Sequence, residues 1–371
     1  MIEQSYAINR RNFIDAATRA GARVEHIPYK RSVLSDVELV TDIALLGPDD
    51  ATQVVIVASG LHGVELPAGS LLQQIWLSEL QKSLPQIQNT KFVFVHALNP
   101  HGAAFGMRTD WDINGQGNID PARNFIDFSK ATNTANFDIA AALHGADLSC
   151  VSAIKMWAKL LYSAFVEQGQ KAFKQGFVRG QYTDPDIPYF GGRASSLSRL
   201  TWDEVISKYV RGQGNKSHVQ KIWHLDCHTG DGPFGLLQLY INDLQGNHVY
   251  TDACRLMDAD RIQMTQQYFA NIAGDIVDYW PQCNIGAAEV TPMTLEFGTS
   301  SAKIEGIDVL NAILTRTILQ NKYGDNHPKA STIIQRMRDA FSPRSSEWEK
   351  AVRLQSEMIW DRFRQILTVG E

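Results

Sequence analysis

The sequence predicts an α/β fold: a single domain with a central mixed, mainly parallel sheet, flanked by helices and carrying helical insertions. Two continuous apolar runs, Gln53–Ser59 and Lys91–Ala97, have the length and β-branched composition of strands buried on both faces. The segment Pro67–Leu84 between them has helical spacing, which predicts a β-α-β unit with a right-handed crossover. No proline- or serine-rich linker divides the 371 residues, so we expect one domain rather than two.

The other elements are justified by the same signals, in chain order. A helix is expected over residues 5–20, because the spacing is amphipathic and Gly21 follows, as is common just after helix ends. Further strands are expected at Val24–Tyr29, Val37–Leu46, Val219–Cys227, Gly235–Ile241 and Pro292–Phe297. Further helices are expected at 138–175, 246–258, 303–322 and 345–367. Long loops are expected at Asn99–Asn136 and Gly180–Leu200, and loops of such length usually have a function or lack order.

The composition excludes several classes of protein. The chain has 35 Lys and Arg against 40 Asp and Glu, so its net charge of −5 excludes nucleic-acid binding through bulk basic charge. With 44% hydrophobic residues, it is not intrinsically disordered. No apolar run approaches the roughly 20 residues that span a bilayer, and the N-terminus lacks the apolar run of a signal peptide. We therefore expect no nucleic-acid or membrane partner.

The cysteines give a further expectation about the compartment. They do not form a CxxC pair, which argues against a structural zinc knuckle, and they are too few for a disulfide scaffold. The four are Cys150, Cys227, Cys254 and Cys283. We expect a reduced, cytoplasmic protein.

Three of the predicted strands end in polar residues of the metal-ligand type. His62 and Glu65 follow the first strand of the β-α-β unit, His228 ends a later strand, and Glu296 lies within the last. In an open, mainly parallel sheet, ligands bind beyond the carboxyl ends of the strands. These four side chains are therefore expected to meet in one crevice.

His62 and Glu65 are separated by three positions, between a strand and a helix. A turn there can direct both side chains to one point. Two histidines and one glutamate with an open fourth position form a catalytic zinc site. Alternatively, His62 caps the following helix and Glu65 is a first-turn acid stabilised by the helix dipole.

His228 is the candidate third ligand. His224, Asp226 and His228 alternate along a strand, so all three face one side. His228 is preferred to His224 because it lies at the strand end, and Asp226 either supports it or is structural. Alternatively, His228 is a partly buried histidine with an ordinary hydrogen bond.

Glu296 lies inside an apolar strand, Thr294-Leu-Glu-Phe-Gly-Thr299. A charge there is costly without a partner, and a cation or a catalytic water would supply one. The alternative is an edge glutamate that faces solvent.

The loop after the second buried strand contains Arg108, Asp120 and Arg123. Arginine binds carboxylates through two parallel hydrogen bonds and can stabilise an oxyanion. Asp120 could orient a zinc-bound histidine by accepting its second N–H. The alternative is a long loop held by internal salt bridges.

Together these motifs resemble the zinc carboxypeptidase superfamily, which includes carboxypeptidase A-like and aspartoacylase-like hydrolases, and within it a poorly characterised bacterial branch. They occur in the family's order, and the resemblance covers residues 37–320. The matching motifs are His62-Gly-Val-Glu65, Asn99-Pro-His-Gly102, Ile119-Asp-Pro-Ala-Arg-Asn-Phe125, His228-Thr-Gly and Leu295-Glu-Phe-Gly-Thr299. The 163 positions that separate Glu65 from His228 imply an insertion at 138–210, and 323–371 is expected to be a C-terminal helical extension.

The resemblance also implies one Zn²⁺ per chain and a role for each site residue. His62, Glu65 and His228 would be the zinc ligands, and Asp120 would orient His62. Glu296 would be the general base and acid, and Arg108 would polarise the scissile carbonyl. Arg123 and Asn124 would bind the substrate, including its carboxylate. One departure is Ala122, where the family has an asparagine that helps to hold the substrate's terminal carboxylate. The family's active-site tyrosine could be Tyr240, Tyr250 or Tyr279.

The resemblance therefore implies a zinc-dependent hydrolase that cleaves an amide bond by promoted-water attack, as a carboxypeptidase-like peptidase does. Its substrate would be a small peptide or an acyl-amino acid that carries a carboxylate. The alternatives are an N-acyl amino acid deacylase of the aspartoacylase type and a catalytically inactive binding protein on the same fold. A further alternative is a two-metal hydrolase that recruits Asp226 or His224.

Overall fold

The computed structural model describes most of the chain. The described residues are 1–31, 37–131, 142–143, 145–167, 178–211, 218–242, 248–265, 272–300 and 306–368. Several predicted segments lie partly outside them. These are residues 132–136 of the first long loop, 138–141, 144 and 168–175 of the helix expected at 138–175, and residues 246–247, 303–305 and 369–371.

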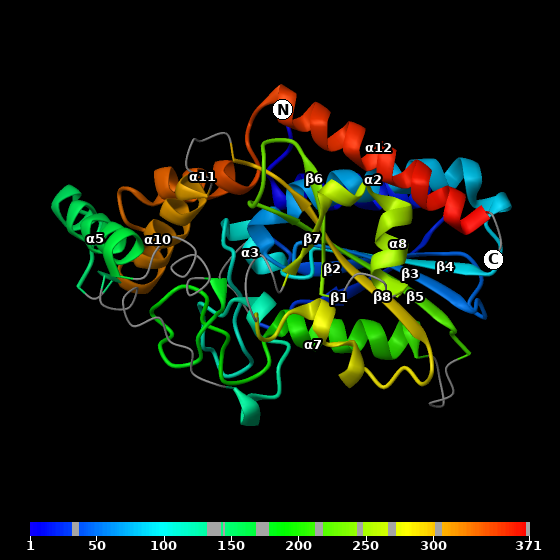
Figure 1. Cartoon of the computed structure of the whole chain (residues 1–371), viewed down its shortest axis with the longest axis horizontal. Coiled ribbons are helices and arrows are strands. Elements are labelled where there is room, and N and C mark those ends of the chain that lie inside the picture. Colours follow the sequence, from blue (N-terminus) through cyan, green and yellow to red (C-terminus); the bar gives the residue numbers. More distant parts are fainter. Residues whose placement is uncertain are drawn as a thin grey trace.

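One eight-stranded sheet forms the centre of the fold (Figure 1). Its strands are β1 (Arg23–Pro28), β2 (Val40–Leu46), β3 (Gln53–Ser59), β4 (Thr90–His96), β5 (Lys221–Thr229), β6 (Leu237–Ile241), β7 (Ile262–Met264) and β8 (Glu289–Phe297). Their order across the sheet is β1-β2-β4-β3-β5-β8-β6-β7. The central strands β4, β3, β5 and β8 are parallel to one another. The pairs β1–β2, β2–β4 and β6–β8 are antiparallel, and the edge strand β7 is parallel to β6. This confirms the predicted mixed, mainly parallel α/β sheet.

Helices cover both faces of the sheet (Figure 1). One face packs against α1 (Tyr6–Arg19), α2 (Leu66–Ser83), α8 (His248–Leu256) and α12 (Ser346–Thr368), through a core rich in large aromatic side chains. The opposite face packs against α7 (Leu197–Val205), where Trp202 is fully buried. Because both faces are covered, the central strands β3 and β4 carry continuous apolar runs rather than alternating ones.

A third group of helices lies beyond the edge where the parallel strands end. It comprises α3 (Pro100–Phe105), α5 (Cys150–Tyr162), α10 (Ile307–Lys322) and α11 (Ala330–Phe341), of which α5, α10 and α11 lie at the left of Figure 1. These helices leave the carboxyl ends of β3 and β5 in the interior of the protein. That edge is where the sequence predicted the site.

Two glycines allow close approaches that shape this edge. A Cβ on Gly69 of α2 would lie 2.6 Å from the Cβ of Ser59, so only glycine lets α2 pack directly on β3. A Cβ on Gly63 would lie 2.1 Å from the backbone nitrogen of Ala103, so only glycine lets α3 contact the turn after His62.

The predicted elements agree with the structure best where the apolar runs are longest, and β3 has the predicted bounds. Among the described helices and strands, three have no predicted counterpart. Helices α3 and α7 begin inside stretches predicted as loops, and β7 had no prediction. Helix α11 lies within the helical extension expected at 323–371, where only 345–367 was predicted as a separate helix. Helix α3 has only six residues and depends on a local cap, in which Asn99 Oδ1 accepts the N–H of Gly102. The insertion at 138–210 and the extension at 323–371 stay predictions.

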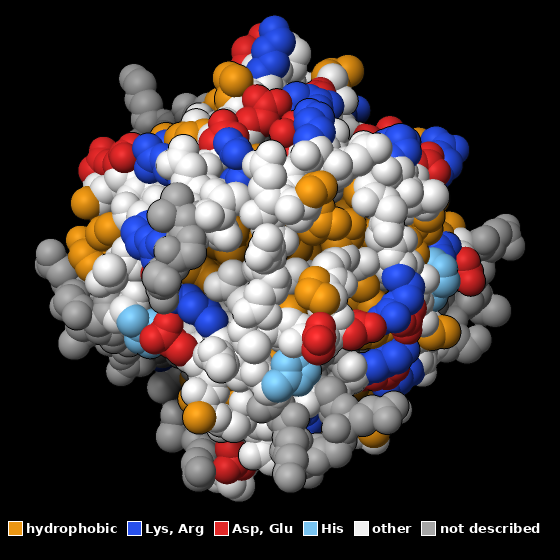
Figure 2. Space-filling view, turned by 90° about the vertical axis from the view of Figure 1, so that its right-hand side faces the viewer, with side chains coloured by type: hydrophobic (Ala, Val, Ile, Leu, Met, Phe, Trp, Pro, Cys, Tyr) orange, Lys and Arg blue, Asp and Glu red, His pale blue; other side chains and the backbone are white. Residues whose placement is uncertain are grey.

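The surface on the side away from this edge is of mixed charge. Figure 2 shows basic and acidic side chains interspersed there rather than gathered into fields of one sign. Among the described residues, no helix combines the length and the apolar composition needed to cross a bilayer.

Candidate metal centre

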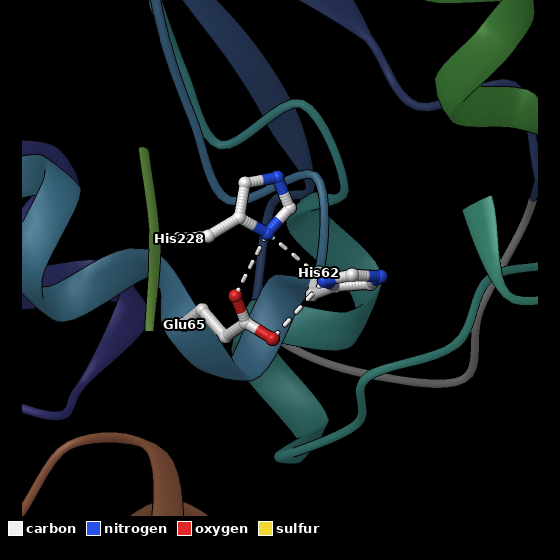
Figure 3. A group of neighbouring side chains, drawn as sticks. All are labelled: His62, Glu65 and His228. Carbon is white, nitrogen blue, oxygen red and sulfur yellow. Dashed lines mark hydrogen bonds and ion pairs between the residues drawn. The ribbon is translucent and has the colours of Figure 1, made fainter. Parts of the chain in front are cut away.

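Three potential metal ligands converge at the carboxyl edge of the sheet (Figure 3). His62 follows β3, Glu65 ends the short 3-10 turn Gly63–Glu65, and His228 lies near the end of β5. One carboxylate oxygen of Glu65 lies 3.0 Å from His62 Nδ1, and the other lies 3.0 Å from His228 Nδ1. The two Nδ1 atoms are 3.1 Å apart. All three side chains are buried.

The strand register explains why residues so distant in sequence meet. Strands β3 and β5 are parallel neighbours in which Ser59 pairs with Cys227, so both strands end at the same level. His228 is in turn the register partner of Glu296 on β8. The ligand group and the proposed base therefore come from three adjacent parallel strands, as the sequence predicted.

A carboxylate holds the far nitrogen of each imidazole. His62 Nε2 lies 2.9 Å from Asp120 Oδ1, and His228 Nε2 lies 2.7 Å from Asp226 Oδ2. Each ring is thereby fixed with Nδ1 towards Glu65. This is the usual arrangement around metal-binding histidines, in which an outer carboxylate sets the tautomer and the ring orientation.

The charges at the site are tightly coupled. Burial by itself would raise the pKa of Glu65, but the charges of His62 and Arg108 outweigh it and hold that pKa well below its usual range. Burial would lower the pKa of His228, but the Asp226 and Glu65 carboxylates outweigh it and hold that pKa well above its usual range. Glu65 is thus a carboxylate, and the protein surrounds it with positive charge.

The donor set fits a metal ion. Two imidazole nitrogens and a carboxylate are suitable Zn²⁺ ligands, and three protein ligands leave a fourth position open. Their ligand atoms lie within 4.8 Å of one another, and no second such group occurs in the described part of the chain. His224 does not join the group, because its Nδ1 accepts a hydrogen bond from Trp280 Nε1 at 3.0 Å. The structure therefore gives no support to the two-metal alternative.

Glu296 lies beside this group without belonging to it. Its Oε1 accepts the backbone N–H of Asp231 at 2.9 Å. Burial, together with the negative charge of Glu65, raises the pKa of Glu296 to about 8. A carboxyl group whose pKa lies near neutrality can both take up and release a proton.

Arg108 links the two carboxylates around His62. Its Nη1 donates to Glu65 Oε1 at 2.6 Å, and its Nε donates to Asp120 Oδ2 at 3.4 Å. The guanidinium is thus held at the ligand group by two buried acids. The structure brings together six of the eight predicted site residues: His62, Glu65, Arg108, Asp120, His228 and Glu296.

Arg123 and Asn124 lie in the predicted loop but are held by backbone groups. Arg123 donates from Nε to Val178 O and from Nη1 to Ala122 O, both at 2.8 Å. Asn124 donates to Gly191 O and accepts the N–H of Ser196, both at 2.7 Å, and its side chain is fully buried. Asn124 therefore braces this loop, and its predicted contact with substrate stays untested.

The residue that the sequence reasoning missed is Tyr189. Its ring centroid lies 5.6 Å from Cζ of Arg108 and 5.7 Å from Cζ of Arg123, so the ring contacts both guanidinium groups. Tyr189 has a φ of 60°, a strained value for a non-glycine residue that often marks a functional site. No sequence pattern distinguishes it from other loop tyrosines. Of the three tyrosines suggested by the resemblance, Tyr240 is linked to Glu296 through one residue. Its hydroxyl donates to the Asp231 carboxylate, and the backbone N–H of Asp231 donates to Glu296.

We expect the Tyr189 ring, rather than its hydroxyl, to hold the two arginines apart. Tyr189→Leu should raise KM for an anionic substrate about tenfold, because cation–π contacts contribute roughly 0.5–2 kcal/mol. Tyr189→Phe keeps the ring and should change KM less than about twofold. Steady-state kinetics of both variants check this. A large effect of Tyr189→Phe would assign the role to the hydroxyl instead.

The two outer carboxylates should control metal affinity. Asp120→Asn and Asp226→Asn are each expected to weaken Zn²⁺ binding about 10- to 100-fold, since each removes the charge that orients an imidazole. Competition with a coloured chelator measures the change. Asp361→Asn, at an exposed position of α12, is the control and should have no effect. Unchanged affinity in both site variants would contradict the proposed metal position.

One protein family and several solved structures are similar to this chain. A family model described as "Protein of unknown function (DUF2817)" matches residues 3–355. The chain belongs to the DUF2817 family. This confirms the expectation of a poorly characterised family. No curated protein matches the chain.

Solved structures similar to this DUF2817 protein include hydrolases of both predicted types. Bovine thrombin-activatable fibrinolysis inhibitor, in complex with tick carboxypeptidase inhibitor, is 11% identical, with a TM-score of 0.45 and 98% of each chain covered. Carboxypeptidase A from Helicoverpa armigera is 12% identical, with a TM-score of 0.48, covering 93% of this chain and 75% of that one. Succinylglutamate desuccinylase from Chromobacterium violaceum is 14% identical, with a TM-score of 0.36, covering 93% and 76%. At these identities the likeness concerns the fold.

Proposed function

We propose that this DUF2817 protein is a metal-dependent hydrolase that cleaves an amide bond, with one Zn²⁺ held by His62, Glu65 and His228. The observation that carries the proposal is the convergence of two Nδ1 atoms on the buried Glu65 carboxylate. In addition, the Nε2 atom of each imidazole contacts a second carboxylate, that of Asp120 for His62 and that of Asp226 for His228. A histidine that merely caps a helix would not need this second carboxylate. The retained Glu296 argues against a binding protein without catalytic activity.

The chemistry divides among the residues as follows. A bound Zn²⁺ would supply a Lewis acid that polarises a carbonyl and lowers the pKa of a water towards about 7. Glu296 accepts the proton of the attacking water and later gives it to the leaving amine. Arg108 donates hydrogen bonds to the carbonyl oxygen as negative charge develops on it. Asp120 and Asp226 keep the imidazoles in place throughout.

Arg123 is the proposed partner of a carboxylate on the leaving group. Two of its nitrogens donate to backbone carbonyls, and Nη2 has no partner among the described residues. Ala122 cannot supply the amide that an asparagine would add beside it. Without that amide the substrate carboxylate is bound less tightly. This weaker binding is equally compatible with a small N-acyl amino acid and with a peptide as the substrate.

The deciding experiment is a substrate panel run alongside metal analysis. We expect the purified protein to contain about one zinc per chain, and to hydrolyse either peptides with free C-termini or N-acyl amino acids. A strong chelator should abolish this hydrolysis, and added zinc should restore it. Absence of metal after gentle purification, with no hydrolysis when zinc is added, would instead indicate a binding protein.

The proposal includes a cytoplasmic location. The structure shows all four cysteines as free thiols. Free cysteines, two of them exposed, are typical of a reducing compartment.

A further inference from the structure

Phe341, the last residue of helix α11, lies against the metal centre although it is outside the region of family resemblance. Its side chain is buried in a small apolar cluster that also contains Val64, the residue before Glu65. A Cβ on Gly230 would lie 2.8 Å from Cε1 of the Phe341 ring, so a larger residue there would displace the ring. The ring thus packs against both the turn that carries Glu65 and the end of β5.

The guanidinium group of Arg108 contacts two aromatic rings. Its Cζ lies 5.8 Å from the centroid of the Phe341 ring and 5.6 Å from that of the Tyr189 ring. Both distances are within the roughly 6 Å over which a cation is attracted to a ring face. Two of its nitrogens donate to the carboxylates of Glu65 and Asp120. Rings and acids together restrict the guanidinium to one orientation.

The backbone of Phe341 is fixed to the same group of residues. Its carbonyl oxygen accepts the hydroxyl of Thr229 at 2.6 Å, and the backbone N–H of Thr229 donates to Glu65 Oε2 at 3.0 Å. Glu65 Oε1 in turn accepts Arg108 Nη1 at 2.6 Å. These contacts close a circuit of four residues, of which Arg108 is the most exposed, at 14% of its side chain.

We propose that Phe341 is a positioning residue, whose ring holds Arg108 in the orientation that donates to the scissile carbonyl. The inference rests on the proposed function, in which Arg108 stabilises the charge that develops on the carbonyl oxygen. Donors to such an oxygen are effective when they are held in place beforehand, because no free energy is then spent on turning them during the reaction. Helix α11 would thus contribute to catalysis through Arg108.

The kinetic test is Phe341→Leu, which removes the ring and keeps an apolar side chain. We expect kcat to fall about tenfold and KM to change less than about twofold, because Arg108 acts on the developing charge and Arg123 on the substrate's carboxylate. In an Arg108→Ala background, Phe341→Leu should have almost no further effect on kcat. If the two changes lowered kcat independently in the double variant, the proposal would be overturned and Phe341 would be a packing residue.

Phe363→Leu is the matched control, because it makes the same change in another C-terminal helix. Phe363 is fully buried in α12 and stacks on Trp76 with their ring centroids 5.5 Å apart, in the core on one face of the sheet. It should lower the thermal stability as Phe341→Leu does, since both open a cavity, and leave kcat unchanged. A similar loss of kcat in both variants would show that a loosened fold is responsible, which overturns the positioning role.

Variants at Thr229 test the same circuit without opening a cavity. Thr229→Val is close in size and removes the hydroxyl that holds the Phe341 carbonyl, while Thr229→Ser keeps it. The backbone N–H that donates to Glu65 is present in both. We expect Thr229→Val to lower kcat about threefold and Thr229→Ser to restore most of it. This pair keeps the proposal testable where Phe341→Leu fails to fold, and an unchanged kcat in Thr229→Val would overturn it.

A spectroscopic readout separates this inference from the proposed function. The ring current of Phe341 shifts the NMR signal of the Arg108 Nε–H, which is identified by its loss in Arg108→Lys. Phe341→Leu should move this signal in the full-length, zinc-supplemented protein, and Phe363→Leu should not. A moved signal supports the contact even if the substrate panel shows no hydrolysis and the proposed function fails. An unmoved signal in an active hydrolase would overturn the positioning role alone.

Discussion

Replacing Glu296 with glutamine is expected to lower amide hydrolysis by about 10³-fold while leaving the zinc content at one per chain. The glutamine has nearly the same shape, and the backbone N–H of Asp231 can still bind its side-chain oxygen. What it loses is the ability to accept a proton from water and return it to the amine. Since Glu296 lies outside the ligand group of His62, Glu65 and His228, the metal should stay bound.

A second glutamate on the same strand provides the control for this change. Glu289 opens β8, is 48% exposed and pairs with Lys221 far from the metal centre. Glu289→Gln should therefore leave hydrolysis and zinc content unchanged. If Glu296→Gln retained normal turnover, the base would have to be sought elsewhere. If it lost zinc together with activity, Glu296 would be a ligand rather than a base.

The parts of the site that the sequence could predict are those fixed by strand ends. His62, His228 and Glu296 lie at or near the ends of predicted strands, and the carboxyl ends of parallel strands must lie at one edge. Glu65 is tied to His62 by a turn of three residues. These positions depend on the local residue pattern and on the geometry of a parallel sheet, and both can be inferred from a single sequence.

The rest of the site depends on contacts that no local pattern shows. Tyr189 reaches the arginines only because the chain after residue 178 folds back over the loop around Asp120, where the N–H of Asp120 binds Phe190 O at 2.7 Å. The supporting role of Asp226, left open by its strand position, is resolved by its bond to His228.

The ligand histidines should each be essential for metal binding. His62→Ala and His228→Ala are expected to weaken Zn²⁺ binding by more than about 10³-fold, since each leaves only two of three protein ligands. Zinc at 1,000 times its dissociation constant should stabilise the unaltered protein by about 4 kcal/mol, and both variants should lose this stabilisation. Thermal unfolding with and without zinc measures it. His248→Ala, an exposed histidine on α8, is the control.

The pH dependence of zinc binding gives an independent test of His228. Zinc needs the lone pair of Nδ1, so a proton on His228 competes with the metal. Because Asp226 and Glu65 hold the pKa of His228 above its usual value, affinity should keep rising with pH past the usual histidine range, by about tenfold per pH unit. It should level off only above the raised pKa. Asp226→Asn removes part of that shift and should move the plateau to lower pH. A plateau at the same pH in both proteins would show that Asp226 does not act through His228.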